Sequence, residues 1–156
     1  MRRILLSLCF LMSFTAFSQN VPYNVNKRKF PLGDEFQKLM PLNIGEWTRY
    51  AFHDYLPNQE NGHVFYKKDN LQIYVVFGKA VNQANLKSIW TKIYDDATIG
   101  KENQIKQKNV VSSTNKYLLM QSAKNYFFAW TRNMYYFSIQ TKNKVDAEEF
   151  MKLFPY

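Results

Sequence analysis

Alternating apolar residues mark the clearest strands in the chain. The segment 71–78 places Leu71, Ile73, Val75 and Phe77 on one face of an extended backbone, because side chains alternate along a strand. It follows a short strand at 63–68 and the turn Asp69-Asn70, so we predict a β-hairpin. An earlier strand is expected over 47–53, separated from the hairpin by a long polar connection.

The second half of the chain repeats this extended pattern. We predict four strands near 105–111, 116–122, 125–132 and 134–141. Short polar turns, including Ser112-Ser113-Thr114, separate them. Adjacent strands joined by turns this short are expected to pair antiparallel.

Helical spacing occurs three times. A short helix is predicted over 34–40, ended by Pro41. Residues 82–97 form an amphipathic pattern, with Asn82 or Asn85 as the expected N-cap. For the last helix we predict a capping box of Asp146 and Glu149, a contact of Val145 with Phe150, and an end at Pro155.

This order of elements predicts an α+β fold. The expected architecture is an antiparallel sheet of about six to seven strands, covered by two or three helices. Residues 31–156 are expected to form a single domain, preceded by a flexible lead-in at 19–30, where no period is present. The chain contains no internal repeat and no low-complexity tract.

The first 18 residues have the pattern of a cleavable signal peptide. Arg2-Arg3 precedes an apolar run at 4–12, and small residues lead to Ser18. The run is shorter than the roughly 20 residues of a membrane-spanning helix. Cys9 lies inside the run behind the bulky Leu8, which disfavours lipidation. We therefore expect an exported protein, periplasmic or secreted, with no stable membrane span after cleavage.

Export changes what the composition implies. Cleavage removes Cys9, the single cysteine, so thiol catalysis and disulfides are not expected. Loss of Arg2 and Arg3 lowers the formal charge from +9 to +7. The expected partner is an envelope protein, a glycan or an anionic surface, and nucleic acid is not expected. A basic solvated surface without a partner explains the charge equally well.

The sequence provides little support for catalysis. His53 and His63 are the two histidines, and neither lies in a nucleophile-elbow motif. Asp95-Asp96 and Glu148-Glu149 are adjacent pairs, whereas a glycosidase needs two carboxylates that face each other across a cleft. No phosphate-binding, dinucleotide-binding or EF-hand motif is present, so we predict no cofactor.

The two histidines are also weighed as metal ligands. The strands that flank them can bring His53 and His63 together, but zinc sites usually need three or four ligands at recognisable spacings. Neither typical spacing is present. We therefore predict no metal site.

Aromatic residues provide the most informative pattern. They make up 17% of the chain, and they occur consecutively in the segments 126–130 and 135–137. Consecutive strand residues point to opposite faces, so both faces of the sheet carry large rings. Either the N-terminal segment and a helix cover the second face, or part of that face is an exposed binding surface. The N-terminal residues that would cover it are Phe30, Phe36, Leu39, Met40 and Trp47.

The hypothesis from these patterns is an exported, non-catalytic binding or accessory protein. The predicted binding face or cleft combines tyrosines, a tryptophan and nearby basic residues: Tyr74, Tyr117, Tyr126, Trp130, Tyr136, Lys67, Lys68 and Arg132. One alternative is a small exported hydrolase with His53 or His63 as the base. Another is a structural subunit of an envelope complex, with the second face buried against another chain.

Overall fold

The computed structural model describes residues 21–33, 35–54, 61–98, 104–110, 115–122 and 124–156. The predicted signal peptide and the predicted turn Ser112-Ser113-Thr114 lie outside these ranges. Within them, no helix is both long enough and apolar enough to cross a membrane.

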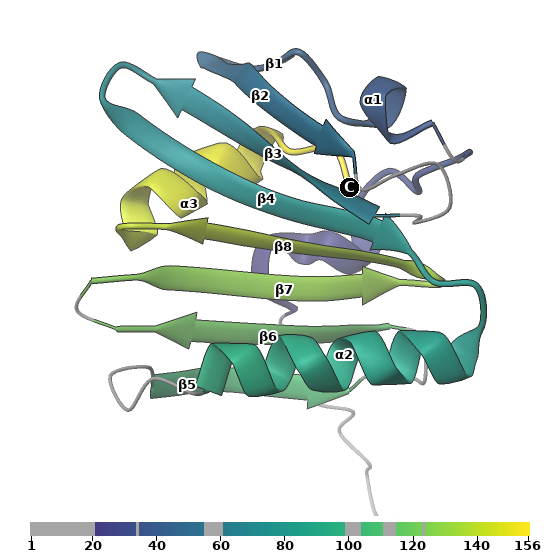
Figure 1. Cartoon of the computed structure of the whole chain (residues 1–156). Helices are drawn as coiled ribbons and strands as arrows, with labels where there is room; N and C mark the ends of the chain where they lie inside the picture. Colours follow the sequence, from purple (N-terminus) through teal and green to yellow (C-terminus); the bar gives the residue numbers. More distant parts are fainter. Residues whose placement is uncertain (1–20, 34, 55–60, 99–103, 111–114, 123) are drawn as a thin grey trace, which may run out of the picture.

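The centre of the fold is one antiparallel sheet (Figure 1). Its strand order is β1-β2-β3-β4-β8-β7-β6-β5. The strands are β1 (Asn43–Ile44), β2 (Trp47–Asp54), β3 (Asn61–Lys68), β4 (Leu71–Lys79), β5 (Gln104–Val110), β6 (Lys116–Gln121), β7 (Tyr126–Arg132) and β8 (Tyr135–Thr141). The α+β class is confirmed, and with the two-residue β1 the sheet has eight strands, against about six to seven predicted from the sequence.

The helix α2 (Gln83–Thr98) covers part of one sheet face, where it packs against β6, β7 and β8 (Figure 1). Its Trp90 packs against Leu118 and Ala129, and Leu86 packs against Tyr136. The helix begins where the sequence predicts, since the Asn82 side chain accepts a hydrogen bond of 2.9 Å from the Asn85 backbone N–H.

The opposite face carries the main hydrophobic core. The helix α3 (Lys144–Leu153), the short helix α1 (Phe36–Leu39) and the N-terminal segment pack on it. The five N-terminal residues predicted to cover a sheet face all take part in this packing: Phe30, Phe36, Leu39, Met40 and Trp47. The N-terminal segment therefore covers this face, as the first of the two alternatives from the sequence describes.

The predicted flexible lead-in contains an ordered turn of helix. Residues Pro22–Lys27 form a 3₁₀ helix, η1, and Val25 is buried in the core. Arg28 then donates side-chain hydrogen bonds to the backbone oxygens of Met151 and Phe154, at the end of α3. Tyr23 also contacts the core, with its ring centroid 5.0 Å from that of Phe128. No period was visible in this segment because these contacts are made with residues far away in the sequence.

The predicted start of the last helix was wrong by one turn. The N-cap of α3 is Asn143, whose side-chain oxygen accepts a hydrogen bond from the Asp146 backbone N–H at 2.9 Å. Asp146 is the third residue of the helix, and its carboxylate accepts a second hydrogen bond, from the side-chain amide of Asn143. Val145 is 70% exposed and does not belong to the main core that contains Phe150.

Candidate functional site

Helix α2 leaves part of its sheet face without a helical cover among the described residues. Its core contacts come from β6, β7 and β8 and from the end of β4. In Figure 1 the strands β2 and β3 lie in the other part of the sheet, away from the helix. We give the name open sheet face to six of the side chains on this uncovered part: Tyr50, His53, His63, Phe65, Lys67 and Tyr74.

Ring contacts run across three strands of the open sheet face. Phe65 on β3 lies between Tyr50 on β2 and Tyr74 on β4, with ring centroids 5.8 and 4.9 Å away. His63 continues this contact, with its centroid 5.4 Å from that of Tyr74. Tyr50 is 44% exposed, and Phe65 and Tyr74 are half-buried. The result is a continuous aromatic surface that is partly in contact with solvent.

A β-bulge in β2 decides which side chains reach this face. Arg49 pairs with Tyr66, but the next paired residue of β2 is Ala51, opposite Phe65. After this shift Phe52 turns into the core, where its ring stacks on Phe77 at 5.5 Å. His53 is thereby placed on the open sheet face, because the extra residue reverses the alternation beyond it.

The bulge brings the two histidines together. His53 and His63 are paired residues of β2 and β3, and their ring centroids are 4.8 Å apart. Burial lowers the pKa of His63 below its usual value, and the nearby His53 lowers it further. Within the described part of the chain, no group of three or more His, Cys, Asp or Glu residues is arranged to hold a metal ion.

Lysine provides the positive charge of the open sheet face. Lys67 is exposed, and its ammonium lies 5.8 Å from the ring centroid of Tyr50. At that distance a cation is attracted to the ring face. The surface therefore combines flat apolar rings with a cationic margin.

A cavity of about 270 Å³ adjoins the open sheet face, between the end of α2 and the sheet. Tyr74 belongs to both. The cavity has apolar walls at Val76, Ile93 and Phe127 and polar groups at Ser138 and Gln140. Its position extends the aromatic surface into a partly enclosed space beneath α2.

The structure separates the predicted binding residues rather than gathering them. Tyr74 and Lys67 lie on the open sheet face. Tyr117, Tyr126 and Trp130 are buried in the main core on the opposite face. Tyr136 is buried beneath α2, with 5% of its surface exposed. These four rings therefore do not form a surface, because the N-terminal segment, α3 and α2 cover them.

The remaining two predicted residues serve other contacts. The Lys68 ammonium bridges Glu46 and Glu149 at 2.7 and 2.6 Å, and these hydrogen bonds raise its pKa. Arg132 is half-buried and donates a hydrogen bond to the backbone oxygen of Arg28. Neither side chain lies with Tyr74 and Lys67.

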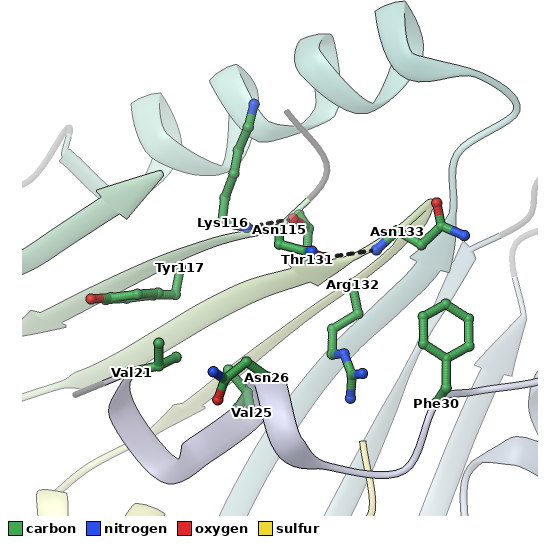
Figure 2. Close-up of a pocket in the computed structure, with 10 residues that line it drawn as sticks. All are labelled: Val21, Val25, Asn26, Phe30, Asn115, Lys116, Tyr117, Thr131, Arg132 and Asn133. Carbon is green, nitrogen blue, oxygen red and sulfur yellow. Dashed lines mark hydrogen bonds between the residues drawn. The ribbon is translucent and has the colours of Figure 1, made fainter. Parts of the chain in front are cut away.

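Arg132 lines a second cavity of about 330 Å³, between η1 and the ends of β6 and β7 (Figure 2). We call it the N-terminal cavity. The Arg132 guanidinium also lies over the Phe30 ring, 5.3 Å from the ring centroid. Burial lowers the pKa of this guanidinium below its usual value.

Tyr50 and Phe65 were not among the binding residues predicted from the sequence, and the two histidines were considered there as catalytic or metal-binding candidates. The alternation of His63, Phe65 and Lys67 along one strand was a usable signal for a shared face. Alternation did not predict that Tyr50 and His53 share a face, because the bulge changes the alternation within β2.

Comparisons with known proteins bear on the fold. No protein-family model matches the chain, and a search of curated proteins found no match. The structure is similar to a crystal structure described as a GTP binding regulator from Thermotoga maritima, with a TM-score of 0.52 and 18% sequence identity. The similarity covers 73% of this chain and 78% of that one. At this identity it shows a shared fold and carries no statement about GTP or regulation here.

Proposed function

We propose that the protein is an exported, non-catalytic binding protein that recognises an envelope protein through the open sheet face. The observation that carries this proposal is the row of ring contacts from Tyr50 through Phe65 to Tyr74 on a sheet face without a helical cover among the described residues. Export rests on the signal-peptide pattern of residues 1–18.

Physical chemistry favours a protein partner for such a surface. Tyrosine and phenylalanine are enriched at the centres of protein interfaces, where they bury large areas and keep few rotatable bonds. The tyrosine hydroxyl groups suit a face that is wet before binding. Lys67 at the margin favours a partner with acidic residues near its aromatic or apolar contact.

The hydrolase alternative receives less support. A histidine base has to lie within hydrogen-bond reach of the group from which it takes a proton. The ring neighbours of His63 include His53, Phe65 and Tyr74, which make an aromatic setting. Such a setting suits contact with a partner surface better than activation of a serine or threonine.

Site-specific photo-crosslinking in the producing cells tests the proposal. A photoreactive amino acid replaces Tyr50, and in a matched control it replaces Val81, which is 70% exposed and outside the open sheet face. We expect a discrete crosslinked protein from position 50 and none from position 81. The same species at both positions would contradict a role for this face.

Second-site changes make the test specific. Lys67→Glu and Tyr74→Ala in the crosslinking variant are expected to remove the crosslinked species, because they reverse the marginal charge and shorten the row of rings. Leu32→Ser, at a residue that is 77% exposed elsewhere, is the control and should leave it unchanged. A crosslink to a second copy of the chain would favour the structural-subunit alternative, and one to polysaccharide would favour a glycan.

A further inference from the structure

The N-terminal cavity contains a cation that the described residues satisfy only in part. Arg132 projects from the end of β7 toward η1, and in the view of Figure 2 its guanidinium lies between Asn26 and Phe30. It donates one hydrogen bond, to the Arg28 backbone oxygen, and stacks on Phe30. No carboxylate among the described residues is paired with it.

Guanidinium chemistry leaves donors available. An arginine side chain carries five N–H donors in a planar fork. One N–H group of Arg132 is bonded to the Arg28 backbone oxygen, and the remaining N–H groups can donate two parallel hydrogen bonds to a carboxylate. A half-buried guanidinium gains more from such a partner than an exposed one, because less water competes for it.

The charge around the cavity favours a single negative charge on the ligand. Lys116 is also a lining residue, but its side chain runs toward α2 and away from the other lining side chains (Figure 2). Arg132 is therefore the one lysine or arginine whose side chain faces the space, among the described lining residues. One guanidinium matches a monocarboxylate better than a phosphate dianion.

The walls of the cavity favour an apolar body on the same ligand. Val21, Val25 and the ring of Tyr117 form its inner side. Val25 and Tyr117 are buried in the main core, so this side is fixed by the fold. A volume of about 330 Å³ is within the range of small-molecule sites, roughly 300–1,000 Å³.

We propose that the N-terminal cavity binds a small monocarboxylate with an apolar body, and that Arg132 pairs with the carboxylate. This inference goes beyond the proposed function, because the cavity lies on the α3 side of the sheet and shares no residue with the open sheet face. The two proposals can therefore succeed or fail separately.

Calorimetric titration with octanoate tests the proposal, with 1-octanol as the uncharged probe of similar length. For the wild-type protein we expect an octanoate dissociation constant between roughly 10 μM and 1 mM. Octanol is expected to bind at least about tenfold more weakly, because it cannot form the ion pair. Added salt should weaken octanoate binding.

Two variants assign the binding to this cavity. Arg132→Gln should weaken octanoate about tenfold or more, and Arg132→Lys less, since lysine keeps the charge but loses the fork. Arg132 also holds Arg28, so a second variant leaves it in place: Asn26→Trp fills the mouth of the cavity from an exposed position. Octanoate binding should be lost in this variant while its melting temperature stays near that of the wild type.

Three results would overturn the proposal. They are no measurable octanoate binding to the wild type at millimolar concentration, equal affinity for octanoate and octanol, and unchanged octanoate affinity in both Arg132→Gln and Asn26→Trp. Tyr50→Ser, on the open sheet face, is the matched control and should bind octanoate as the wild type does. Loss of crosslinking at the open sheet face would leave all these expectations unchanged.

Discussion

His53 and His63 lie directly opposite each other on β2 and β3, with their ring centroids 4.8 Å apart. Two imidazoles at this distance cannot both be protonated without mutual repulsion. Partial burial of His63 adds to the cost of its charged form. The charge of His63 on the open sheet face therefore depends on its burial and on the neighbouring His53.

The first prediction concerns the titration of this pair. We expect His63 to titrate below its usual pKa of 6.5, because burial and His53 both disfavour its charged form. His53→Asn should raise the pKa of His63, but not fully to 6.5, since burial remains. NMR titration of the imidazole C–H signals measures the pKa of His63 in the wild type and in the variant. If this pKa did not rise in the variant, an effect of His53 on His63 would be contradicted.

The same shift predicts a pH dependence of stability. The unfolded chain binds a proton at position 63 more tightly than the folded chain, since the folded pKa is the lower one. The contribution of His63 to the free energy of unfolding is therefore fully present above about pH 6.5. It is lost as the pH falls from there through the pKa of His63 in the folded protein. Urea denaturation across this range should show a smaller loss for His63→Gln than for the wild type.

A second prediction concerns Gly62, next to the histidine pair. A Cβ at this position would lie 2.6 Å from the His53 backbone oxygen and 2.9 Å from the Phe77 ring. Gly62→Ala should lower the free energy of unfolding by about 1–3 kcal/mol, as overpacking does. It should also shift the NMR signals of His53. Lys67→Ala on the same strand is the exposed control, and an equal effect there would contradict the steric explanation.

The third prediction separates core rings from surface rings. Trp130 is fully buried between Phe128 and Phe137, with ring centroids 5.1 and 5.3 Å away. Trp130→Ala should cost about 3–5 kcal/mol in urea denaturation. Tyr136→Ala, beneath α2, should cost about 2–5 kcal/mol for the same reason. Leu32→Ala is the exposed control, and wild-type stability in either core variant would show that its ring is not in the core.

The fourth prediction concerns the cap of α3. Asn143→Ala removes the hydrogen bond to the Asp146 backbone N–H and should cost about 0.5–2 kcal/mol. Asn143→Asp should retain most of the stability, because a carboxylate accepts the same bond. Lys142→Ala, one residue earlier and exposed, is the control. If Asn143→Ala behaved like this control, another residue would have to be the cap.

Much of the fold was predictable because the signals are local. Alternation along 71–78 and the helical period over 82–97 follow from the geometry of the backbone, so β4 and α2 agree with their predicted ranges closely. The segment 22–27 was missed for the opposite reason. Its order depends on Val25 entering a distant core and on Arg28 binding the end of α3, and neither contact leaves a periodic pattern.

The candidate site was predictable only in part. Lys67 and Tyr74 were assigned to a binding face from the sequence, and they do lie on the same side of the hairpin. The rings of Tyr117, Tyr126 and Trp130 are chemically as suitable, yet they are buried. Composition records how many rings a strand carries, whereas burial depends on which segments return to cover each face.

The sequence by itself determined the α+β elements, their antiparallel connections and the presence of aromatic rings on both sheet faces, because all three follow from local spacing. The tertiary structure alone decided where those rings are uncovered. The bulge after Arg49 turned Phe52 into the core and His53 outward, and α2 came to lie over β6 to β8 rather than β2 and β3. Both outcomes depend on packing between segments far apart in the chain, which no local pattern encodes.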